Sequence, residues 1–317
     1  MRDSDYGTRG RPEWLDVDWS RHLHDVKIRG RTVRYVEMGA EHEDAVVVIH
    51  GLGANWQTFL DNIPFFARTH HVIGLDLPGF GQSEMPAEDV SISLYADIVG
   101  ELCEHVGIRE ATVMGNSMGG FVGAELAIRH PERVESLVLI SPAILWGEYR
   151  RAKPLMSLAR ISELTVGRFL AGEAPSIVRK RPRLRAATIY LGGIEYPHRL
   201  SPELQMELLA TVKRTRGFTP ALVAFGNYAV REELPRISCR TLLVWGDRDR
   251  LVSVKHAAQL ADLIPDCRVE IFKNTGHVAM LERPERFNRV VAEFMAESGD
   301  ASDRRAAERG RAAESAV

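Results

Sequence analysis

The sequence predicts an α/β fold with a mostly parallel, doubly wound sheet and a helical insertion, and three observations lead to this prediction. Short runs of β-branched and aliphatic residues alternate with helical patterns along most of the 317 residues. The run Ala45–Ile49 is apolar at every position, which is typical of a parallel strand buried on both faces. The alternation stops between Pro142 and about Val230, where the pattern remains helical with Gly and Pro breaks. We therefore expect one sheet whose chain path is interrupted once.

The elements follow in order along the chain. Two strands come first, His24–Ile28 and Thr32–Met38, and they flank a turn at Gly30, which predicts an antiparallel hairpin. Further apolar runs predict the strands Ala45–Ile49, His71–Leu75, Ala111–Met114, Glu135–Ile140, Thr241–Trp245 and Arg268–Phe272. Helical patterns lie between them at Ser93–Val106, Met118–His130, His256–Leu263 and Arg283–Ala296. Because strands and helices alternate, we expect parallel pairing with helices on both faces of the sheet.

The domain organisation follows from these elements. The expected parts are an N-terminal arm over 1–22, a core over 23–141 and 231–296, a helical insertion over 142–230, and a tail over 297–317. Apolar residues in the arm would attach it to the body, and they are Trp14, Leu15, Val17 and Trp19. The tail has almost no large apolar residue and is predicted to be disordered, because burial cannot offset the loss of chain entropy.

Charge is unevenly distributed over these parts. The whole chain has a formal net charge of −2, which gives no argument for binding nucleic acid or a bulk membrane. The insertion, however, contains fourteen Lys and Arg against six Glu and no Asp, so it carries +8. Such a charge is typical of solvated helix faces. The sharper hypothesis is attraction of an anionic substrate, an acidic partner or lipid headgroups, which would bring the basic insertion into peripheral contact with a membrane.

The cysteines and the apolar runs bear on the compartment. The chain has three cysteines, Cys103, Cys239 and Cys267, and a sparse, odd set does not form a disulfide framework. The N-terminal dozen residues are polar and Arg-rich, without the apolar stretch of a secretory signal. The apolar runs are too short to span a bilayer. We expect a cytoplasmic protein without a transmembrane segment.

The pentapeptide Gly115-Asn116-Ser117-Met118-Gly119 is the sharpest chemical signal in the sequence. It has the pattern G-x-S-x-G and lies between a predicted strand and a predicted helix, which is the context of a nucleophile elbow. The glycines permit the sharp turn and leave space around the serine. The first N–H groups of the new helix point toward the site, where they can stabilise an oxyanion. The sequence therefore predicts that Ser117 is a nucleophile.

A serine hydroxyl is a weak nucleophile without a base, and the base in turn needs a carboxylate that fixes its tautomer. His277 follows the strand Arg268–Phe272, so it is expected at the carboxyl edge, where parallel sheets bind ligands. Two aspartates, Asp247 and Asp249, follow the strand Thr241–Trp245. We assign the acid role to Asp249 because it lies deeper in the loop, and a turn-shaping role to Asp247.

The loops after two earlier strands complete the predicted site. After Ala45–Ile49 the sequence reads His-Gly-Leu-Gly, and the backbone N–H of Leu52 is the expected oxyanion donor, together with that of Met118. His50 is expected to hold this loop by hydrogen bonds. The segment Asp76–Ser83 (DLPGFGQS) is expected to form a tight turn, because Asp, Pro and Gly suit turns.

Five motifs together resemble the α/β-hydrolase superfamily. HGLG, DLPGFGQS, GNSMGG, GDRD and TGH occur in that family's order and spacing between about His24 and Ala296. The resemblance implies the α/β-hydrolase fold, with the triad Ser117, Asp249 and His277. It also implies that the insertion over 142–230 is a cap that covers the site and sets substrate choice. The candidate substrate contacts are Leu145, Trp146, Phe169, Tyr190, Phe225 and Val278.

The nucleophile narrows the reaction that the resemblance implies. Haloalkane dehalogenases and epoxide hydrolases need a carboxylate nucleophile, and this chain has Ser117 at the elbow. A serine with His and Asp suits acyl transfer, so we expect hydrolysis of a small or medium-sized apolar ester through an acyl-enzyme. Neither a metal nor an organic cofactor is expected, and the histidines show no H-E-x-x-H pattern.

Three other functions remain open at this point. GNSMGG resembles the elbow of hydrolases that cleave C–C bonds in ring-cleavage products. Those enzymes usually have a longer, Pro-containing glycine loop, and often a Trp where this chain has Val278. A cofactor-free perhydrolase or haloperoxidase-like activity is a second alternative. A non-catalytic small-molecule receptor is a third, because receptors of this fold can retain a triad.

Overall fold

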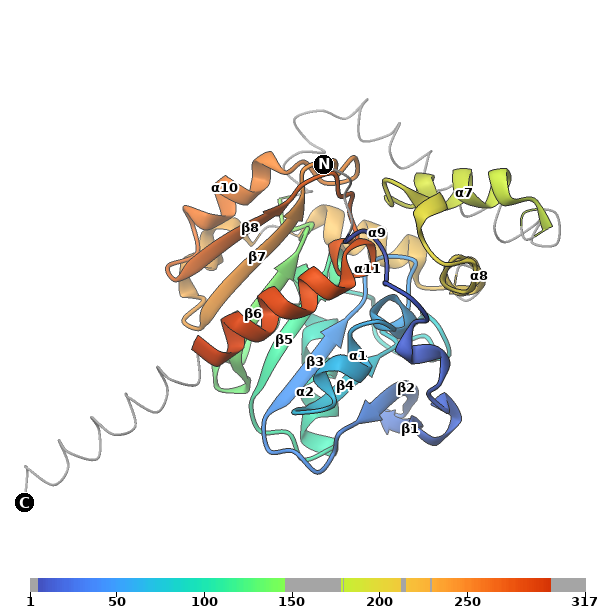
Figure 1. The fold of residues 1–317 in the computed structure, drawn as a ribbon. Coiled ribbons are helices and arrows are strands. Elements are labelled where there is room, and N and C mark those ends of the chain that lie inside the picture. The colour runs from blue at the N-terminus through green and yellow to red at the C-terminus, as the bar shows by residue number, and fades with distance from the viewer. Residues whose placement is uncertain (1–4, 146–177, 179, 212–214, 229, 298–317) are drawn as a thin grey trace, which may run out of the picture.

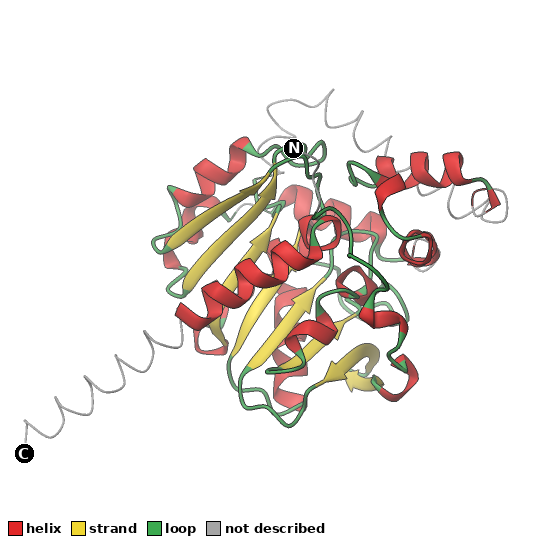
Figure 2. Cartoon of the chain, in the orientation of Figure 1, coloured by secondary structure: helices red, strands yellow, loops and turns green. Residues whose placement is uncertain are grey.

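The sheet of the computed structural model lies between two layers of helices (Figures 1 and 2). The structure describes residues 5–145, 178, 180–211, 215–228 and 230–297. Eight strands pair in the order β1-β2-β4-β3-β5-β6-β7-β8. Their bounds are β1 Leu23–Ile28, β2 Arg31–Met38, β3 Ala45–Ile49, β4 His71–Leu75, β5 Ala111–Asn116, β6 Val134–Ile140, β7 Arg240–Gly246 and β8 Cys267–Phe272. All neighbours from β4 to β8 pair in parallel, while β1 and β2 form an antiparallel edge.

The hairpin of β1 and β2 is confirmed, and its turn explains its register. Ile28 pairs with Arg31, so the loop has two residues. Both have positive φ, 50° at Arg29 and 73° at Gly30. Two consecutive positive φ values are the signature of the type I′ turn, whose twist matches that of the flanking strands.

Helices connect the parallel strands as expected. Their bounds are α1 Ile63–Phe66, α2 Ile92–His105, α3 Met118–Arg129, α7 Pro182–Leu191, α8 Pro202–Thr211, α9 Phe218–Asn227, α10 Lys255–Ala261 and α11 Ala279–Glu282. A long helix over 284–297 follows α11 and is red in Figure 1. Single 3-10 turns are η1 Glu13–Leu15, η2 Trp19–Arg21, η3 Trp56–Phe59, η4 Pro131–Arg133, η5 Pro197–Arg199 and η6 Arg231–Arg236. The fold is thus the mostly parallel, doubly wound sheet that the alternation predicted.

Two hydrophobic cores lie on the two faces of the sheet, and β3 contributes to both. All five residues of β3 are buried. Val47 and Ile49 belong to the core that includes α2 and α3. Val46 and Val48 belong to the other core, which contains η3, α1 and the helix over 284–297. Because strand side chains alternate between faces, a continuous apolar run is what a doubly covered strand requires.

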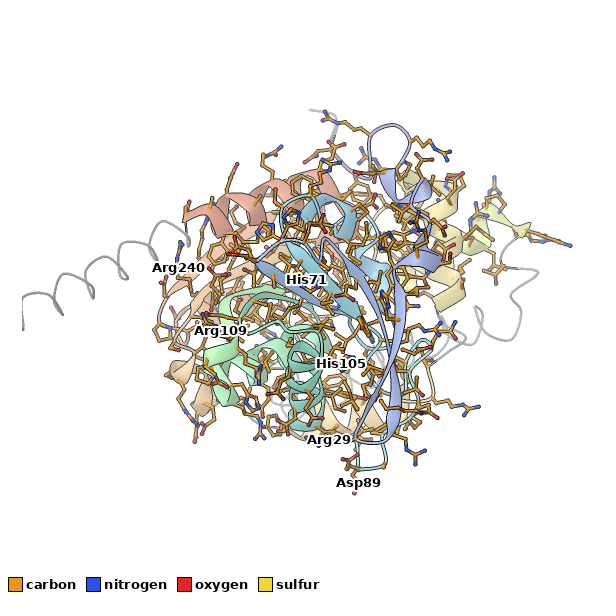
Figure 3. All side chains as sticks on the ribbon, turned by 90° about the horizontal axis from the view of Figure 1, so that it is seen from below. Arg29, His71, Asp89, His105, Arg109 and Arg240 are labelled. Carbon is orange, nitrogen blue, oxygen red and sulfur yellow. The ribbon has the colours of Figure 1, made fainter. Side chains whose placement is uncertain are left out.

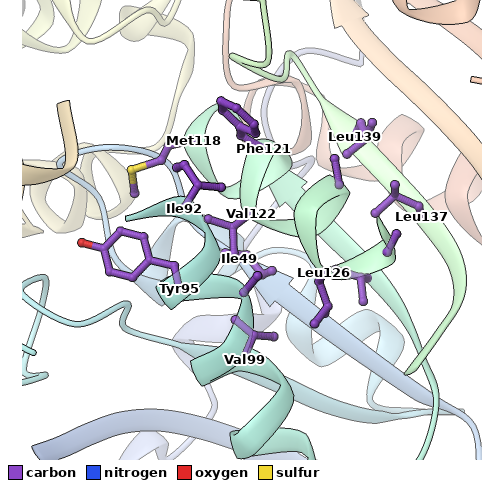
Figure 4. Packing of buried hydrophobic residues seen from close by; sticks show 14 of the residues in the cluster. Ile49, Ile92, Tyr95, Val99, Met118, Phe121, Val122, Leu126, Leu137 and Leu139 are labelled. Atoms are coloured by element: carbon purple, nitrogen blue, oxygen red, sulfur yellow. The ribbon is translucent and has the colours of Figure 1, made fainter. Parts of the chain in front are cut away.

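Helix α3 packs tightly between the sheet and α2 (Figure 4). Phe121 and Val122 of α3 lie beside Ile49 of β3 and Ile92 of α2 in this view, and all four side chains are fully buried. Burial of such side chains stabilises the fold by about 1.5–3 kcal/mol each. The packing fixes the first turn of α3, which carries the residues after the predicted nucleophile.

The amino ends and the carboxyl ends of the parallel strands form two opposite edges of the sheet, and the two edges carry different residues. In Figure 3 the amino-terminal edge is marked by His71 and Arg240, which begin β4 and β7, and by Arg109, which precedes β5. The opposite, carboxyl edge carries the loops after β3, β5, β7 and β8, and these loops contain every predicted catalytic residue. The topology therefore brings the predicted site together on one side.

The N-terminal arm and the described part of the insertion lie against this body. Trp14 is buried, and the ring of Trp19 lies 4.9 Å from that of Trp56. The insertion is helical where it is described, with α7, α8 and α9. The predicted disordered tail falls almost wholly on 298–317, outside the described residues. Within the described part of the chain, no helix has the length and apolarity needed to cross a membrane.

Candidate active site

Ser117 occupies a sharp turn between β5 and α3, with φ 56° and ψ −114°. A positive φ is strained for a residue with a Cβ atom, and strain of this kind marks functional sites. The neighbouring strand fixes the turn, because Ser117 N donates to Ile140 O at 2.9 Å and Ala143 N donates to Ser117 O at 3.0 Å. This is the strand–turn–helix context that the G-x-S-x-G pattern requires.

The two outer glycines of the pentapeptide make this turn sterically feasible. A Cβ atom on Gly119 would lie closer than 3.0 Å to the carbonyl oxygens of Ile49 and His50. A Cβ atom on Gly115 would collide in the same way with the backbone of Gly119. The turn therefore admits no side chain at either position, since the colliding atoms belong to the backbone.

His277 and Asp249 meet on the loops after β8 and β7. His277 Nδ1 lies 2.8 Å from Asp249 Oδ2, and the two side chains are only 6% and 0% exposed. The other oxygen of Asp249 accepts hydrogen bonds from the backbone N–H groups of Leu251 and Val252, both at 2.9 Å. A carboxylate held in this way places the proton on Nδ1, so that Nε2 is free to accept one.

Asp247 lies on the same loop as Asp249 but makes a different contact. Its Oδ1 accepts a hydrogen bond from the backbone N–H of Thr275 at 3.4 Å, so it joins the loops after β7 and β8. Its own N–H donates to Phe272 O at 3.0 Å. Asp249, and not Asp247, is thus the aspartate that the structure places against His277.

The backbone of His277 is held by two groups that the sequence did not indicate. Asn116 Nδ2 donates to the carbonyl oxygens of Ile140 and His277, both at 3.1 Å. His277 N donates to Gly193 O in the insertion at 2.8 Å. Asn116 stands at a position of G-x-S-x-G where the motif specifies no residue type, and Gly193 is 84 residues from His277 in the sequence. Neither contact could therefore be predicted from the local sequence.

No hydrogen bond joins the side chains of Ser117 and His277. Among the described residues, the Ser117 hydroxyl makes no hydrogen bond. The two residues are nevertheless neighbours, since Asn116 bonds the carbonyl of His277. Such hydrogen bonds are often long in free enzymes and shorten only when substrate is bound.

The two predicted oxyanion donors lie beside Ser117. A Cβ atom on Gly51 would be 3.2 Å from Ser117 Cβ, so the loop after β3 is in contact with the elbow. In the described part of the chain, the N–H groups of Leu52 and Met118 have no hydrogen-bond acceptor. Met118 is the first residue of α3, where N–H groups lack partners inside the helix. Two N–H groups without acceptors beside the elbow are what an oxyanion site requires.

His50 is a structural residue, as expected. Its Nε2 accepts a hydrogen bond from Leu77 N at 2.9 Å, so its Nδ1 carries the proton and donates to Gly51 O at 2.8 Å. Complete burial lowers the pKa of His50 to about 4. The neutral ring joins the loop after β3 to the DLPGFGQS turn, in which Asp76 accepts hydrogen bonds from the backbone N–H groups of Trp56 and Gln82.

This burial predicts a loss of stability in mild acid. Between pH 6.5 and about 4, the unfolded chain binds a proton at His50 that the folded chain does not. The free energy of unfolding should therefore fall as the pH falls through this range, by at most about 3 kcal/mol. Urea unfolding at pH 7.5 and 4.5 measures the loss in the native chain and in His50→Gln, which cannot take up the proton. Equal losses in both proteins would contradict the assignment.

The other histidines do not form a second centre. His71 Nε2 pairs with Glu37 Oε1 at 2.7 Å near the amino edge of the sheet. In the ranges that the structure describes, no group of three or more His, Cys, Asp or Glu side chains is arranged to hold a metal ion.

The predicted substrate contacts fall into three groups. Leu145, Phe225 and Val278 are buried. Tyr190 is 40% exposed, and the guanidinium carbon of Arg250 lies 3.4 Å from its ring centre. Trp146 and Phe169 lie outside the described residues.

Comparison with known proteins adds three kinds of similarity. The family model described as alpha/beta hydrolase fold matches residues 44–284. The chain is 30% identical over 277 residues to the dihydrolipoyllysine-residue acetyltransferase component of the acetoin cleaving system of Cupriavidus necator, with 84% of this chain and 67% of that protein covered. It is 28% identical over 277 residues to a 2-hydroxy-6-oxo-6-phenylhexa-2,4-dienoate hydrolase of Comamonas testosteroni, with 83% and 91% covered.

Among solved structures, the chain is similar to a membrane phospholipase A that is a bacterial virulence factor. The TM-score is 0.67 and the sequence identity is 29%, over 87% of this chain and 86% of that chain.

Proposed function

The chain belongs to the α/β-hydrolase fold family of enzymes, and we propose that it is a serine hydrolase that cleaves a carboxylic ester of a small or medium-sized apolar substrate. The observation that carries the proposal is the placement of three groups on one sheet edge. Ser117 is held at a strained elbow, and the buried pair of Asp249 and His277 lies on the adjoining loops. The similarity to a phospholipase, an enzyme of carboxylic esters, supports the same chemistry.

In the proposed reaction, Ser117 Oγ attacks the ester carbonyl while His277 Nε2 takes the hydroxyl proton. Asp249 keeps the proton of the neutral ring on Nδ1 and stabilises the imidazolium that forms. The C–O bond of the ester then breaks, and the departing alcohol takes the proton from His277. An acyl group remains on Ser117, and water activated by His277 releases it as the acid.

The oxyanion of each tetrahedral intermediate would lie against the N–H groups of Leu52 and Met118. Both are backbone donors fixed by the fold, so they need no reorganisation when charge develops. Leu145, Phe225 and Val278 would form part of an apolar wall for the acyl or alkyl chain, since they are buried side chains of the insertion and the His277 loop.

A second candidate is cleavage of a C–C bond in a ring-cleavage product. The specific observation in its favour is the 28% identity to the dienoate hydrolase over 91% of that protein. That chemistry would use the same elbow on a different substrate. We place it second because the loop after β3 is short and Val278 follows His277.

A series of p-nitrophenyl esters of increasing chain length, run beside 2-hydroxy-6-oxo-6-phenylhexa-2,4-dienoate, separates the two reactions. We expect hydrolysis of the esters, with a preferred chain length and no comparable turnover of the dienoate. Ser117→Ala, purified and measured in parallel, gives the background activity from contaminating enzymes, which is subtracted. Turnover of the dienoate alone would reverse the order of the two candidates.

A further inference from the structure

A buried carboxylate lies directly behind the His277 loop, and neither the pattern of motifs nor the proposed reaction uses it. Glu282 ends α11 and has no measurable exposure. Its Oε2 accepts hydrogen bonds from Tyr6 OH at 2.5 Å, Gly276 N at 2.9 Å and Glu195 N at 3.0 Å. Its Oε1 accepts one from Val278 N at 3.2 Å. Four donors from three distant parts of the chain thus converge on one side chain.

Two of these donors flank the proposed general base. Gly276 and Val278 are the residues immediately before and after His277, so Glu282 holds the peptide groups on both sides of it. The loop also has no free space on this side, because a Cβ atom on Gly276 would collide with Gly193 O and lie 2.9 Å from Glu282 Oε1. The direction of the imidazole is therefore coupled to the position of one carboxylate.

The other two donors come from the N-terminal arm and the insertion. Tyr6 OH accepts a hydrogen bond from Tyr196 N at 2.8 Å, so its own proton is directed to Glu282. The rings of Tyr6 and Tyr196 pack edge to face with centres 5.4 Å apart. The guanidinium groups of Arg199 and Arg283 lie 5.0 and 5.3 Å from the Tyr6 ring centre. Tyr6 thus lies between the insertion and the core.

The hydrogen-bond donors around position 282 explain why this position needs a carboxylate. Three of the four groups that face Glu282 are backbone N–H groups, which can only donate, and Tyr6 OH donates as well, so the set matches the ionised form. The charged neighbours are Arg283, which pairs with Asp5 and bonds Thr275 Oγ1 at 2.6 Å, and Glu195, which pairs with Arg250 at 3.5 Å. Burial raises the pKa of Glu282, and its hydrogen bonds oppose this rise.

We propose that Glu282 is a positioning residue for His277, and that Tyr6 ties this position to the N-terminal arm and the insertion. The inference rests on the proposed function, in which His277 is the general base. A base must be held closely to its productive geometry, and a misplacement of about 1 Å can cost about 10²-fold in rate. Glu282 supplies this constraint through the backbone on both sides of the ring.

The main test is Glu282→Gln, which keeps the shape but replaces an acceptor by an amide group that donates. We expect kcat for the preferred p-nitrophenyl ester to fall by about 10²-fold, with KM changed by less than about threefold. The peptide groups on both sides of His277 also lose the carboxylate that holds them, so the surroundings of the imidazole ring should change. The NMR signals of the His277 ring should therefore differ between the native protein and Glu282→Gln at the same pH, without any substrate.

Two further variants make the test specific. Tyr6→Phe removes only one of the four donors, so kcat should fall several-fold, and Tyr6→Phe with Glu282→Gln should be no worse than Glu282→Gln alone. Glu285→Gln is the matched control, because Glu285 is a partly exposed glutamate on the next helix that pairs with Arg9, and it should keep native kcat. Circular dichroism and urea unfolding establish that each variant is folded.

The outcomes separate the two proposals. An active native enzyme whose Glu282→Gln variant has native kcat and unchanged NMR signals at His277 overturns the positioning role. If Glu282→Gln does not fold, Tyr6→Phe decides, and a native kcat in that variant overturns the role equally. A native chain that hydrolyses no ester counts against the proposed function instead, and the NMR signals of His277 then still decide the positioning role.

Discussion

Replacing Asp249 by asparagine is expected to lower kcat for ester hydrolysis by about 10⁴-fold, with little change in KM. The carboxylate lies 2.8 Å from His277 Nδ1 and keeps the ring proton there. The amide of asparagine can present its N–H₂ group to Nδ1, which favours the tautomer with the proton on Nε2. That tautomer cannot accept the proton of Ser117. Steady-state kinetics with the preferred ester measure the effect.

Asp247→Asn is the matched control for this experiment. Asp247 lies two residues away on the same loop, but its side chain bonds the backbone of Thr275 and not His277. We expect kcat within a few-fold of the native value, with a small loss of stability. A large loss of kcat in Asp247→Asn, together with native activity in Asp249→Asn, would transfer the acid role to Asp247.

The second large effect is expected at the elbow. Gly119→Ala should lower the free energy of unfolding by about 3 kcal/mol or more, because overpacking against rigid backbone cannot be relieved by a rotamer change. The new methyl group would overlap the carbonyl oxygens of Ile49 and His50. Any folded fraction should also lack activity, since the first turn of α3 carries Met118. Urea unfolding and ester hydrolysis measure the two effects.

Gly100→Ala provides the comparison for Gly119→Ala. Gly100 is also buried within a helix, α2, but a Cβ atom there has its nearest neighbour at 3.7 Å, which is ordinary contact. Alanine should stabilise this helix by about 0.5–1 kcal/mol. If both substitutions destabilised the protein equally, the close approach at Gly119 would not be the reason for its glycine.

The strands were predictable because burial on two faces leaves a simple pattern. The bounds of β3 agree with the expected Ala45–Ile49, where every residue is apolar and β-branched or small. The expected end of β5 at Met114 was wrong by two residues, because Gly115 and Asn116 continue the ladder and pair with Leu139 and Ile140. Glycine and asparagine have low strand propensity, and here the pairing with β6 outweighs it.

The insertion was predictable only as helical. Helices α7 and α9 have no side-chain hydrogen bond at their N-caps, so the capping signal that helps to locate a helix start is missing. Their apolar residues pack into different cores of the body, with Ile189 of α7 in one and Ala221 and Phe225 of α9 in the other.

The site was predictable as far as it follows strand ends. Ser117, Asp249 and His277 each lie just after an apolar run, so their meeting at one edge follows from parallel pairing. The contact between Tyr6 and Glu282 joins residues 276 positions apart, and no local pattern predicts such a pair. The one local feature that singles out Glu282 in the sequence is its place in a Glu-Arg pair directly after the apolar run Val278–Leu281.

The most direct measurement of the central claim is labelling of the native protein with a fluorophosphonate probe, followed by peptide mass spectrometry. We expect one covalent label, on Ser117, formed by the folded protein and absent after heat denaturation. We also expect no label on Ser117→Ala. A native protein that stays unlabelled, or a label on a different residue, would contradict the claim that Ser117 is an activated nucleophile.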